Sequence, residues 1–573
     1  MNKKRNITLF IFLFAILITK PQAQVCLVKN NEPQSRIILI SNNKADSSAA
    51  RLLQDFAKRI TDATLPIISD SSIRKGDVII GGKLQKKIKK DGFSLSTKGG
   101  YLRIVGAGKG SIYGVVTLLE KYLNVSYYGE KEYTLTKQKE ITLPFINLVD
   151  NPAFQYRQIQ YYALNDPICK MWFRVDDSSK LFAGGYFVHT FNRLLPPDIY
   201  GKAHPEYYAY YNGTRHPDKT SQLCLTNPEV FEIIAHKVDS IFKANPGMKL
   251  ISVSQNDVNN TYCTCDNCKK IDKYEGAQSG SLIHFLNKLA ARFPDKEFST
   301  LAYQYSLNPP KHVKPLPNVN IMLCDIGCTR EASLTDNNNG REFVKAMKAW
   351  TKITHNIFLW DYGINFSDFL TPFPNFHIMQ DNIRLFKKNH ITMHFSEIGG
   401  ARGGDFSELR AYLVAKLMWN PEVNTDSLTH TFLSGYYGKA VPYIYQYLKL
   451  IEGALISSGN KLKIFDSPVS HKNGMLRPDL MRRYNTIFDD AEKAVTDNQV
   501  QLMRVQRSRL SLQYSELEIA RTENVKDSDD LSRKLDLFEE RVREFKVPTL
   551  KESIYSPIEY CQWYREHYIY SKK

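Results

Sequence analysis

Short apolar runs and longer amphipathic stretches alternate along the chain, and their spacing predicts the secondary structure. The first amphipathic stretch, residues 45–63, places Leu52, Phe56 and Ile60 on one helical face, and a second helix is expected at residues 110–123. The apolar runs between turn residues predict strands at 36–41, 77–80, 92–96, 101–105 and 125–128. Together they predict a small α+β domain over residues 35–147.

From Pro152 onward, strand and helix patterns alternate over about 250 residues, as in a β/α barrel. The expected strands are 155–162, 186–191, 221–225, 250–254, 297–303, 319–323, 357–360 and 391–395. The expected helices between them are 228–245, 279–293, 342–352 and 375–388. The second and third strands are the weakest patterns. We therefore predict a (β/α)8 TIM-like barrel over residues 152–421.

The rest of the chain has helical periodicity. Helices are expected at 408–419, 426–437, 441–457, 479–496, 499–521 and 530–545. The predicted fold class is thus α/β: a (β/α)8 barrel, preceded by the small α+β domain and followed by an α-helical C-terminal region at 422–573.

The first residues predict export. Lys3, Lys4 and Arg5 precede an apolar run at 7–18, which is typical of a signal peptide with cleavage after Ala23. That run is too short to span a bilayer, and no later run is long enough. We expect a secreted protein that is periplasmic or at the cell surface. A lipid anchor on Cys26 is an alternative, which residues 23–25 support only weakly.

The net charge of +18 raises the possibility of an anionic partner. The lysines are scattered and no nucleic-acid motif accompanies them, so no nucleic-acid partner is expected. The 33 Tyr and 30 Phe residues can stack on sugars or fill cores, and composition leaves both uses open.

Nine cysteines in an exported chain can form disulfides, and the odd count leaves at least one without an intramolecular partner. Cys263, Cys265 and Cys268 follow a C-x-C-x-x-C spacing that also resembles part of a zinc site, but no fourth ligand follows downstream at a suitable spacing. Zinc, disulfides and free thiols all remain open for this trio.

Polar residues follow several expected strands. The stretch 249–270 is the most informative, because a short apolar strand ends in Asn256 and Asp257. A β/α barrel presents its catalytic groups at such carboxyl ends. Acids, aromatics and an arginine in one pocket suit glycoside chemistry. The candidates are Asp257, Glu397 and Asn256 for catalysis, and Arg157, His189, Trp360, Asp361, Tyr362 and His394 for substrate binding.

Each candidate also has a structural reading. Glu397 could form a salt bridge, Asp257 could cap a turn, and Asp361 could pair with an arginine. His189 and His394 are weak signals when taken alone.

The order of motifs resembles the family known as domain of unknown function 4838, part of which is counted as glycoside hydrolase family 163. The matching motifs between residues 154 and 421 include His189-Thr-Phe, His204-Pro-Glu-Tyr-Tyr, Gln222-Leu-Cys-Leu-Thr-Asn-Pro-Glu, Ser252-Val-Ser-Gln-Asn-Asp, Trp360-Asp-Tyr, Pro372-Phe-Pro-Asn and Glu397. Gly110-Ser-Ile-Tyr-Gly and Pro152-Ala-Phe-Gln-Tyr-Arg resemble the domain that precedes the barrel in β-hexosaminidases and α-glucuronidases. The resemblance implies an exported glycosidase and, as in characterised members, endo-β-N-acetylglucosaminidase activity on N-glycans.

Hydrolysis at N-acetylhexosamine often uses the acetamide of the substrate as the nucleophile, with retention of configuration. Asn256 would hold that acetamide, and Asp257 or Glu397 would protonate the leaving oxygen with a raised pKa. This departs from the Asp-Glu pair of the hexosaminidases. The expected partner is an oligosaccharide or glycoprotein glycan, and no cofactor or metal is expected in the reaction. Two alternatives are an α-glucuronidase-like enzyme that binds a carboxylate through Arg157, and a non-catalytic glycan-binding protein.

Overall fold

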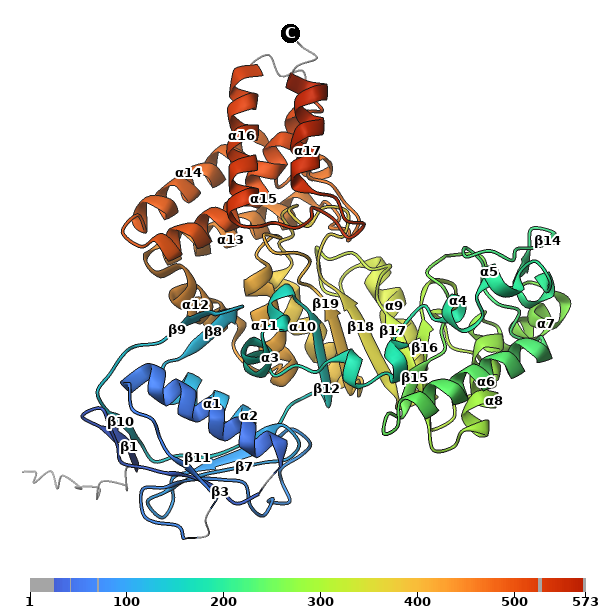
Figure 1. Cartoon of the computed structure of the whole chain (residues 1–573). Coiled ribbons are helices and arrows are strands. Elements are labelled where there is room, and N and C mark those ends of the chain that lie inside the picture. The colour runs from blue at the N-terminus through green and yellow to red at the C-terminus, as the bar shows by residue number, and fades with distance from the viewer. Residues whose placement is uncertain (1–24, 42, 70–71, 524–527, 570–573) are drawn as a thin grey trace, which may run out of the picture. The chain divides into compact units, whose positions relative to one another are not determined.

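A computed structural model describes residues 25–41, 43–69, 72–523 and 528–569 (Figure 1). The predicted signal peptide lies outside these residues. The described chain divides into two compact units. The first contains the residues up to Val125 together with Leu135–Asn151, and the second contains Ser126–Thr134 and the chain from Pro152 onward. The predicted barrel and the predicted C-terminal helices therefore fall into one unit.

The first unit is built on a six-stranded sheet. Its strand order is β11 (Asn147–Asp150), β6 (Phe93–Ser96), β7 (Leu102–Gly106), β5 (Val78–Ile80), β3 (Ile37–Leu39), β4 (Ile67–Ile68). A smaller sheet joins β10 (Ile141–Leu143), β1 (Val25–Lys29) and β2 (Glu32–Pro33). These strands include the four that the sequence predicted before residue 106, and β6 and β7 pair as the expected hairpin.

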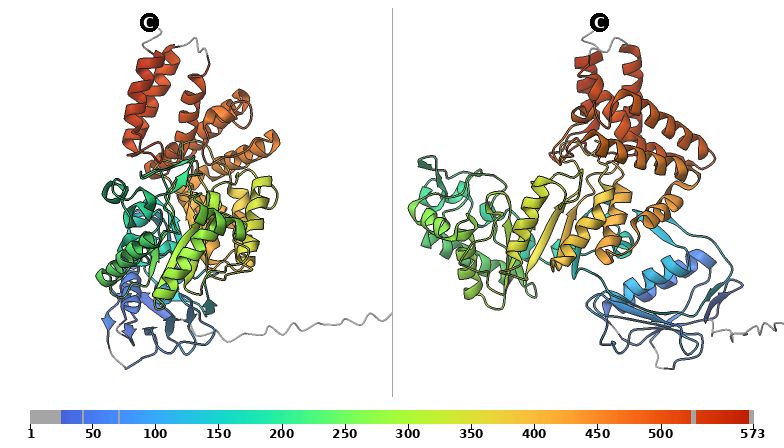
Figure 2. Two further views of the ribbon diagram at one scale, coloured as in Figure 1. Left: turned by 90° about the vertical axis from the view of Figure 1, so that its right-hand side faces the viewer. Right: turned by 180° about the vertical axis from the view of Figure 1, so that it is seen from behind.

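Helices α1 (Lys44–Thr61) and α2 (Gly110–Tyr122) lie side by side on one face of that sheet (Figures 1 and 2). The α1 helix begins where the Asn43 side chain accepts the Asp46 N–H, and it ends at Asp62 in a left-handed conformation. Its predicted apolar face, Leu52, Phe56 and Ile60, is buried. Both predicted helices are confirmed.

The second unit contains a curled sheet of six parallel strands (Figure 1). Their order is β12 (Tyr156–Gln160), β19 (Met393–Glu397), β18 (Ile357–Tyr362), β17 (Val319–Cys324), β16 (Glu297–Ala302), β15 (Leu250–Ser252). The first and last strands in sequence, β12 and β19, are neighbours, as closure of a barrel requires. The described residues form six of the eight expected strands. The α/β class is thus confirmed, whereas the complete barrel is not.

The second predicted strand, residues 186–191, is wrong. His189 has a positive φ of 52°, a conformation that ends an extended run. The Thr190 hydroxyl donates to the Ser252 carbonyl at 2.9 Å and accepts the Ser254 N–H at 3.0 Å. Backbone bonds also run from the Ser252 N–H to the Tyr186 carbonyl and from the Thr190 and Phe191 N–H groups to the Ser254 carbonyl, so the segment contacts the edge of β15 without forming a strand ladder.

The third predicted strand, residues 221–225, is also wrong. Only an isolated antiparallel bridge between Tyr208 and Leu223 forms there. The Gln222 side chain donates to the Asn256 carbonyl, and the Ser221 carbonyl accepts the Asn256 amide, so this segment bonds to the Asp257 loop and does not join the parallel ladder.

Helices flank the parallel strands in sequence as predicted. They are α6 (Pro228–Ala244), α8 (Ser279–Arg292), α9 (Asn338–Trp350), α10 (Phe376–Lys388) and α11 (Ser407–Trp419). The structure adds α3 (Pro167–Phe173), α4 (Phe191–Leu194), α5 (Pro197–Tyr200) and α7 (Asp266–Glu275), which the periodicity did not reveal.

All the predicted C-terminal helices are present: α12 (Thr425–Tyr437), α13 (Val441–Ser458), α14 (Pro478–Ala494), α15 (Gln499–Ala520) and α16 (Ser528–Glu544). A further helix, α17 (Pro557–Tyr564), was not predicted. Among the described residues, no helix combines the length and apolar character needed to cross a membrane.

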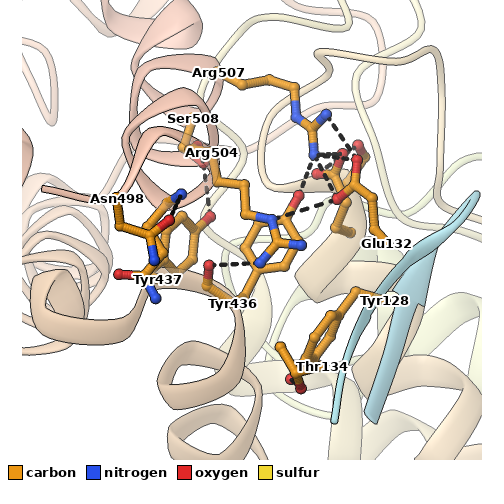
Figure 3. Close-up of polar contacts among 12 residues, drawn as sticks. Tyr128, Glu132, Thr134, Tyr436, Tyr437, Asn498, Arg504, Arg507 and Ser508 are labelled. Carbon is orange, nitrogen blue, oxygen red and sulfur yellow. Dashed lines mark hydrogen bonds and ion pairs between the residues drawn. The ribbon is translucent and has the colours of Figure 1, made fainter. Parts of the chain in front are cut away.

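The hairpin of β8 (Ser126–Gly129) and β9 (Glu132–Thr134) packs with these helices in the second unit. Glu132 receives hydrogen bonds at 3.1 Å from both terminal nitrogens of Arg507 on α15 (Figure 3). Arg507 also lies 3.2 Å from the Glu408 carboxylate of α11 and donates to the Tyr436 hydroxyl. One buried guanidinium therefore joins the hairpin to three helices.

Candidate active site

The register of the parallel strands decides which predicted residues share a face. Trp360 is paired with Phe395, and Tyr362 with Glu397, so these side chains lie on one face of the sheet. Residues one position away in the same strands point to the opposite face. The site is therefore built around Trp360, Tyr362 and Glu397.

Glu397 is the last residue of β19 and is partly buried. The Trp360 indole N–H donates to its Oε2 at 2.9 Å. Burial raises the pKa of Glu397 to about 7; the indole hydrogen bond opposes this rise, and the charges of Glu552 and Asp257 add to it. A carboxyl group of this kind holds a proton that it can donate near neutral pH.

Asp257 follows β15 in a polar loop, and its side chain is 62% exposed. Its Oδ1 accepts a hydrogen bond from the Tyr303 hydroxyl at 2.8 Å. The His189 Nε2 lies 4.0 Å from the same oxygen, and the rings of His189 and Tyr303 meet edge to face at 5.9 Å. The structure thus places Asp257 and His189 next to each other.

Two residues that interact with Asp257 and Glu397, Tyr303 and Glu552, were not among the predicted site residues. Tyr303 is the final residue of a predicted strand, and its position at a strand end was the available signal. Glu552 lies between α16 and α17, where its backbone N–H donates to the Phe366 carbonyl at 3.1 Å. No local pattern in the sequence indicates that Glu552 acts on Glu397.

The structure contradicts the role predicted for Asn256. Its Nδ2 donates to Asn192 Oδ1 at 2.9 Å and to the Ser221 carbonyl at 2.7 Å, and its Oδ1 accepts the Asn192 N–H at 3.0 Å. The residue is only 4% exposed. Because protein groups engage both ends of this amide, Asn256 positions the Asp257 loop rather than an acetamide.

The substrate-binding role predicted for Arg157 is also contradicted. Arg157 lies on the opposite face of the sheet and is 1% exposed. Its Nη1 donates to the Phe154 carbonyl at 2.7 Å and its Nε to the Arg174 carbonyl at 2.9 Å. The guanidinium therefore closes a backbone turn and cannot hold a substrate carboxylate.

Asp361 and His394 lie on that opposite face too. The His394 ring is fully buried between Phe154 and Phe386, and its Nε2 is 3.6 Å from Asp361 Oδ2. Burial alone would raise the pKa of Asp361, but His394 and the Arg330 guanidinium outweigh it and lower this pKa to about 2. Both residues belong to a buried polar network rather than to a substrate pocket.

The aromatic residues form a layer beside Glu397. Trp360 stacks on Phe187 at 5.4 Å and on Tyr362 at 5.9 Å. Trp360 and Tyr362 are each only 8% exposed, so packing and orientation of Glu397 are their main uses in this structure.

All nine cysteines lie in the described part of the chain, and no disulfide joins any of them. A cavity of about 710 Å³ lies among α14, α15 and α16. None of the predicted site residues lines that cavity, and paired charges such as Arg509 and Glu492 occupy its wall.

The fold belongs to a class seen in glycoside hydrolases. A family 89 glycoside hydrolase from Clostridium perfringens, in complex with 2-acetamido-1,2-dideoxynojirmycin, aligns with a TM-score of 0.51 and 11% identity over 87% of this chain and 66% of that chain. A β-N-acetylhexosaminidase from Bacteroides fragilis aligns with a TM-score of 0.42 and 11% identity, over 72% of this chain and 91% of that one. At 11% identity, the similarity to the family 89 enzyme shows the fold alone.

The family model "Domain of unknown function (DUF4838)" matches residues 127–449, and the chain belongs to this family, as the motifs predicted. No curated protein matches the sequence.

Proposed function

We propose that the protein is a glycoside hydrolase that acts on glycans containing N-acetylhexosamine. More specifically, we propose that it is an endo-β-N-acetylglucosaminidase that cleaves N-glycans with retention of configuration. The observation that carries the proposal is Glu397: a partly buried carboxyl group at a strand end, with a pKa of about 7, beside a second acid.

In this proposal, Glu397 is the general acid that protonates the glycosidic oxygen. Asp257 orients the acetamide, because its carboxylate can accept the acetamide N–H while the Tyr303 hydroxyl holds it in place. The acetamide oxygen then attacks the anomeric carbon as the bond to the leaving oxygen breaks and that oxygen takes the proton of Glu397. Water then attacks the anomeric carbon and opens the cyclic intermediate, and Glu397 takes the proton of the water, which restores its protonated form. Asn256 supports the loop, which replaces its predicted role.

Two lines of comparison support this substrate class. The Clostridium perfringens enzyme of similar fold binds an acetamido sugar analogue. The family resemblance independently implies hydrolysis at N-acetylglucosamine.

The α-glucuronidase alternative needs Arg157 to bind the carboxylate of a uronate. Arg157 is buried on the opposite face of the sheet and cannot do so. In addition, Glu397 interacts with the charges of Asp257 and Glu552, and such a group of acids disfavours a uronate. The non-catalytic alternative is left for experiment.

The test is glycan release from N-glycoproteins and mucins, read by mass spectrometry. Glu397→Gln should lower turnover at least about 100-fold, the usual contribution of a general acid. Glu422→Gln, an exposed carboxylate paired with Arg384, is the matched control and should leave turnover unchanged. Glycan binding without any product from the wild-type chain would favour the non-catalytic reading, and release of uronic acid from a xylan fragment would favour the glucuronidase.

Export is part of the same proposal. N-terminal sequencing of the mature protein should find Gln24 first if Ala23 is the cleavage site. A lipid-modified Cys26 at the N-terminus would instead show the anchored form.

A further inference from the structure

Four cysteine sulfurs converge next to the loop that carries Asp257. Cys224, Cys263, Cys265 and Cys268 place their sulfur atoms within 4.8 Å of one another. All but the half-buried Cys265 are buried. The ligand that the C-x-C-x-x-C motif lacked is Cys224, which lies upstream of the motif rather than downstream.

The spacing of the sulfurs fits a bound metal better than disulfides. Sulfurs held tetrahedrally at about 2.3 Å from Zn²⁺ lie about 3.8 Å apart. The Sγ atoms of Cys224 and Cys265 are 3.7 Å apart. A disulfide needs about 2.05 Å, and it would join the sulfurs in pairs rather than gather four around one point.

Neighbouring donors are placed to stabilise thiolates. The Tyr210 backbone N–H donates to Cys263 Sγ at 3.4 Å, and Arg215 Nη1 lies 3.6 Å from the same sulfur. The Thr226 hydroxyl lies 3.2 Å from Cys268 Sγ. Backbone and side-chain donors of this kind surround thiolate-bound metals and tune their affinity. Cys268 also lies in the first turn of α7, where the helix dipole favours negative charge.

We propose that these four cysteines bind one Zn²⁺ in a closed structural site. With four protein ligands the ion has no open position for water, so it takes no part in the reaction. Of the three states left open for the cysteine trio, this proposal selects zinc, and the reaction itself still needs no metal.

The site would fix the loop that carries Asp257. Cys224 lies two residues after Gln222, whose side chain receives the Asn256 N–H at 2.9 Å and donates to the Asn256 carbonyl at 3.0 Å. Cys263 follows Asp257 on the other side of the loop. A metal shared by both segments therefore holds the loop at each end, and this positional role rests on the proposed function.

The experiment measures metal rather than activity, so its result is independent of the glycosidase proposal. The full chain is purified without chelator, and its zinc content and alkylatable thiols are determined. We expect one zinc per chain and no disulfide among these cysteines. Zinc-loaded protein should exchange its metal for Co²⁺ and show the visible bands of tetrahedral thiolate coordination.

Cys224→Ser should lose the zinc, whereas Cys561→Ser, which removes a buried thiol of α17, should keep it. Chelation of the wild-type chain should increase hydrogen exchange in residues 257–265. Two disulfides within the cluster would overturn the proposal. Four free thiols that take up no zinc under reducing conditions would overturn it equally.

Discussion

Burial, opposed by the hydrogen bond from Trp360, sets the acidity of the proposed general acid, Glu397. The indole N–H stabilises the ionised carboxylate, while burial and the charges of Glu552 and Asp257 stabilise the protonated form. Only the protonated form can donate to a leaving group, so kcat/KM should fall as the pH rises through about 7.

Two substitutions that shift the pKa of Glu397 in opposite directions should move the fall of kcat/KM at alkaline pH in opposite directions. Trp360→Phe removes the indole donor, so the pKa of Glu397 should rise and the fall should move up by about one pH unit, since a hydrogen bond to a charged group contributes about 1.5 kcal/mol. Glu552→Gln removes a nearby negative charge, so the fall should move to lower pH. The measurement is kcat/KM against pH for each variant. Shifts in the same direction, or none, would show that Glu397 is not the titrating acid.

At the scale of the element, strand geometry explains which candidates were misplaced. Trp360, Asp361 and Tyr362 are consecutive in β18, so the middle residue must face away from the other two. The same alternation separates His394 from Glu397 in β19. Adjacent positions in a sequence motif can all matter to a family and still serve different faces, one for the site and one for a buried network.

The Arg507 cluster makes a prediction at this scale. Arg507 is 5% exposed and is shared by Glu132 and Glu408, so Arg507→Ala leaves the buried Glu408 and the half-buried Glu132 without it; its contact with Glu132 is drawn in Figure 3. Loss of one partner from a buried ion pair costs about 3 kcal/mol or more. Arg533→Ala is the control, since its exposed pair with Asp530 contributes about 0.5 kcal/mol. Denaturant unfolding measures both, and equal effects would refute the role of the cluster.

The contact between Arg507 and Glu132 also predicts how the folding stability depends on pH. Burial would raise the pKa of Glu132, but Arg507 outweighs it and holds that pKa below its usual 4.5. The stability that Glu132 contributes is therefore complete above about pH 4.5 and is lost as the pH falls further. Arg507→Ala should reduce this acid sensitivity.

At the scale of the whole molecule, the sequence was informative wherever periodicity was strong. The long C-terminal helices and the strands of the parallel sheet were predicted within a few residues, because one apolar face or one buried run defines each. The failures have other causes. The segment near His189 depends on the Thr190 side chain bonding to β15, and the segment near Leu223 forms only a single bridge with Tyr208. Glu552 lies in a loop far along the chain, and its charge acts on Glu397. Cys224 was visible in the sequence, but its distance from the other cysteines hid its role.

Net charge and site charge have opposite signs in this molecule, and that difference can be measured. The chain carries a net charge of +18, while the proposed site groups Glu397 with the charges of Asp257 and Glu552. Non-specific attraction of anionic polysaccharides should therefore fall steeply as salt rises from about 50 to 500 mM, because screening shortens the range of the surface field. Turnover of a neutral N-acetylhexosamine glycan depends on short-range contacts and should change less than about twofold over that range. Hydrolysis of the neutral glycan and binding of a uronate-bearing polysaccharide, measured side by side against ionic strength, separate the two effects. If turnover of the neutral glycan fell with salt as steeply as binding of the anionic one, the surface charge, and not the acidic site, would govern recognition.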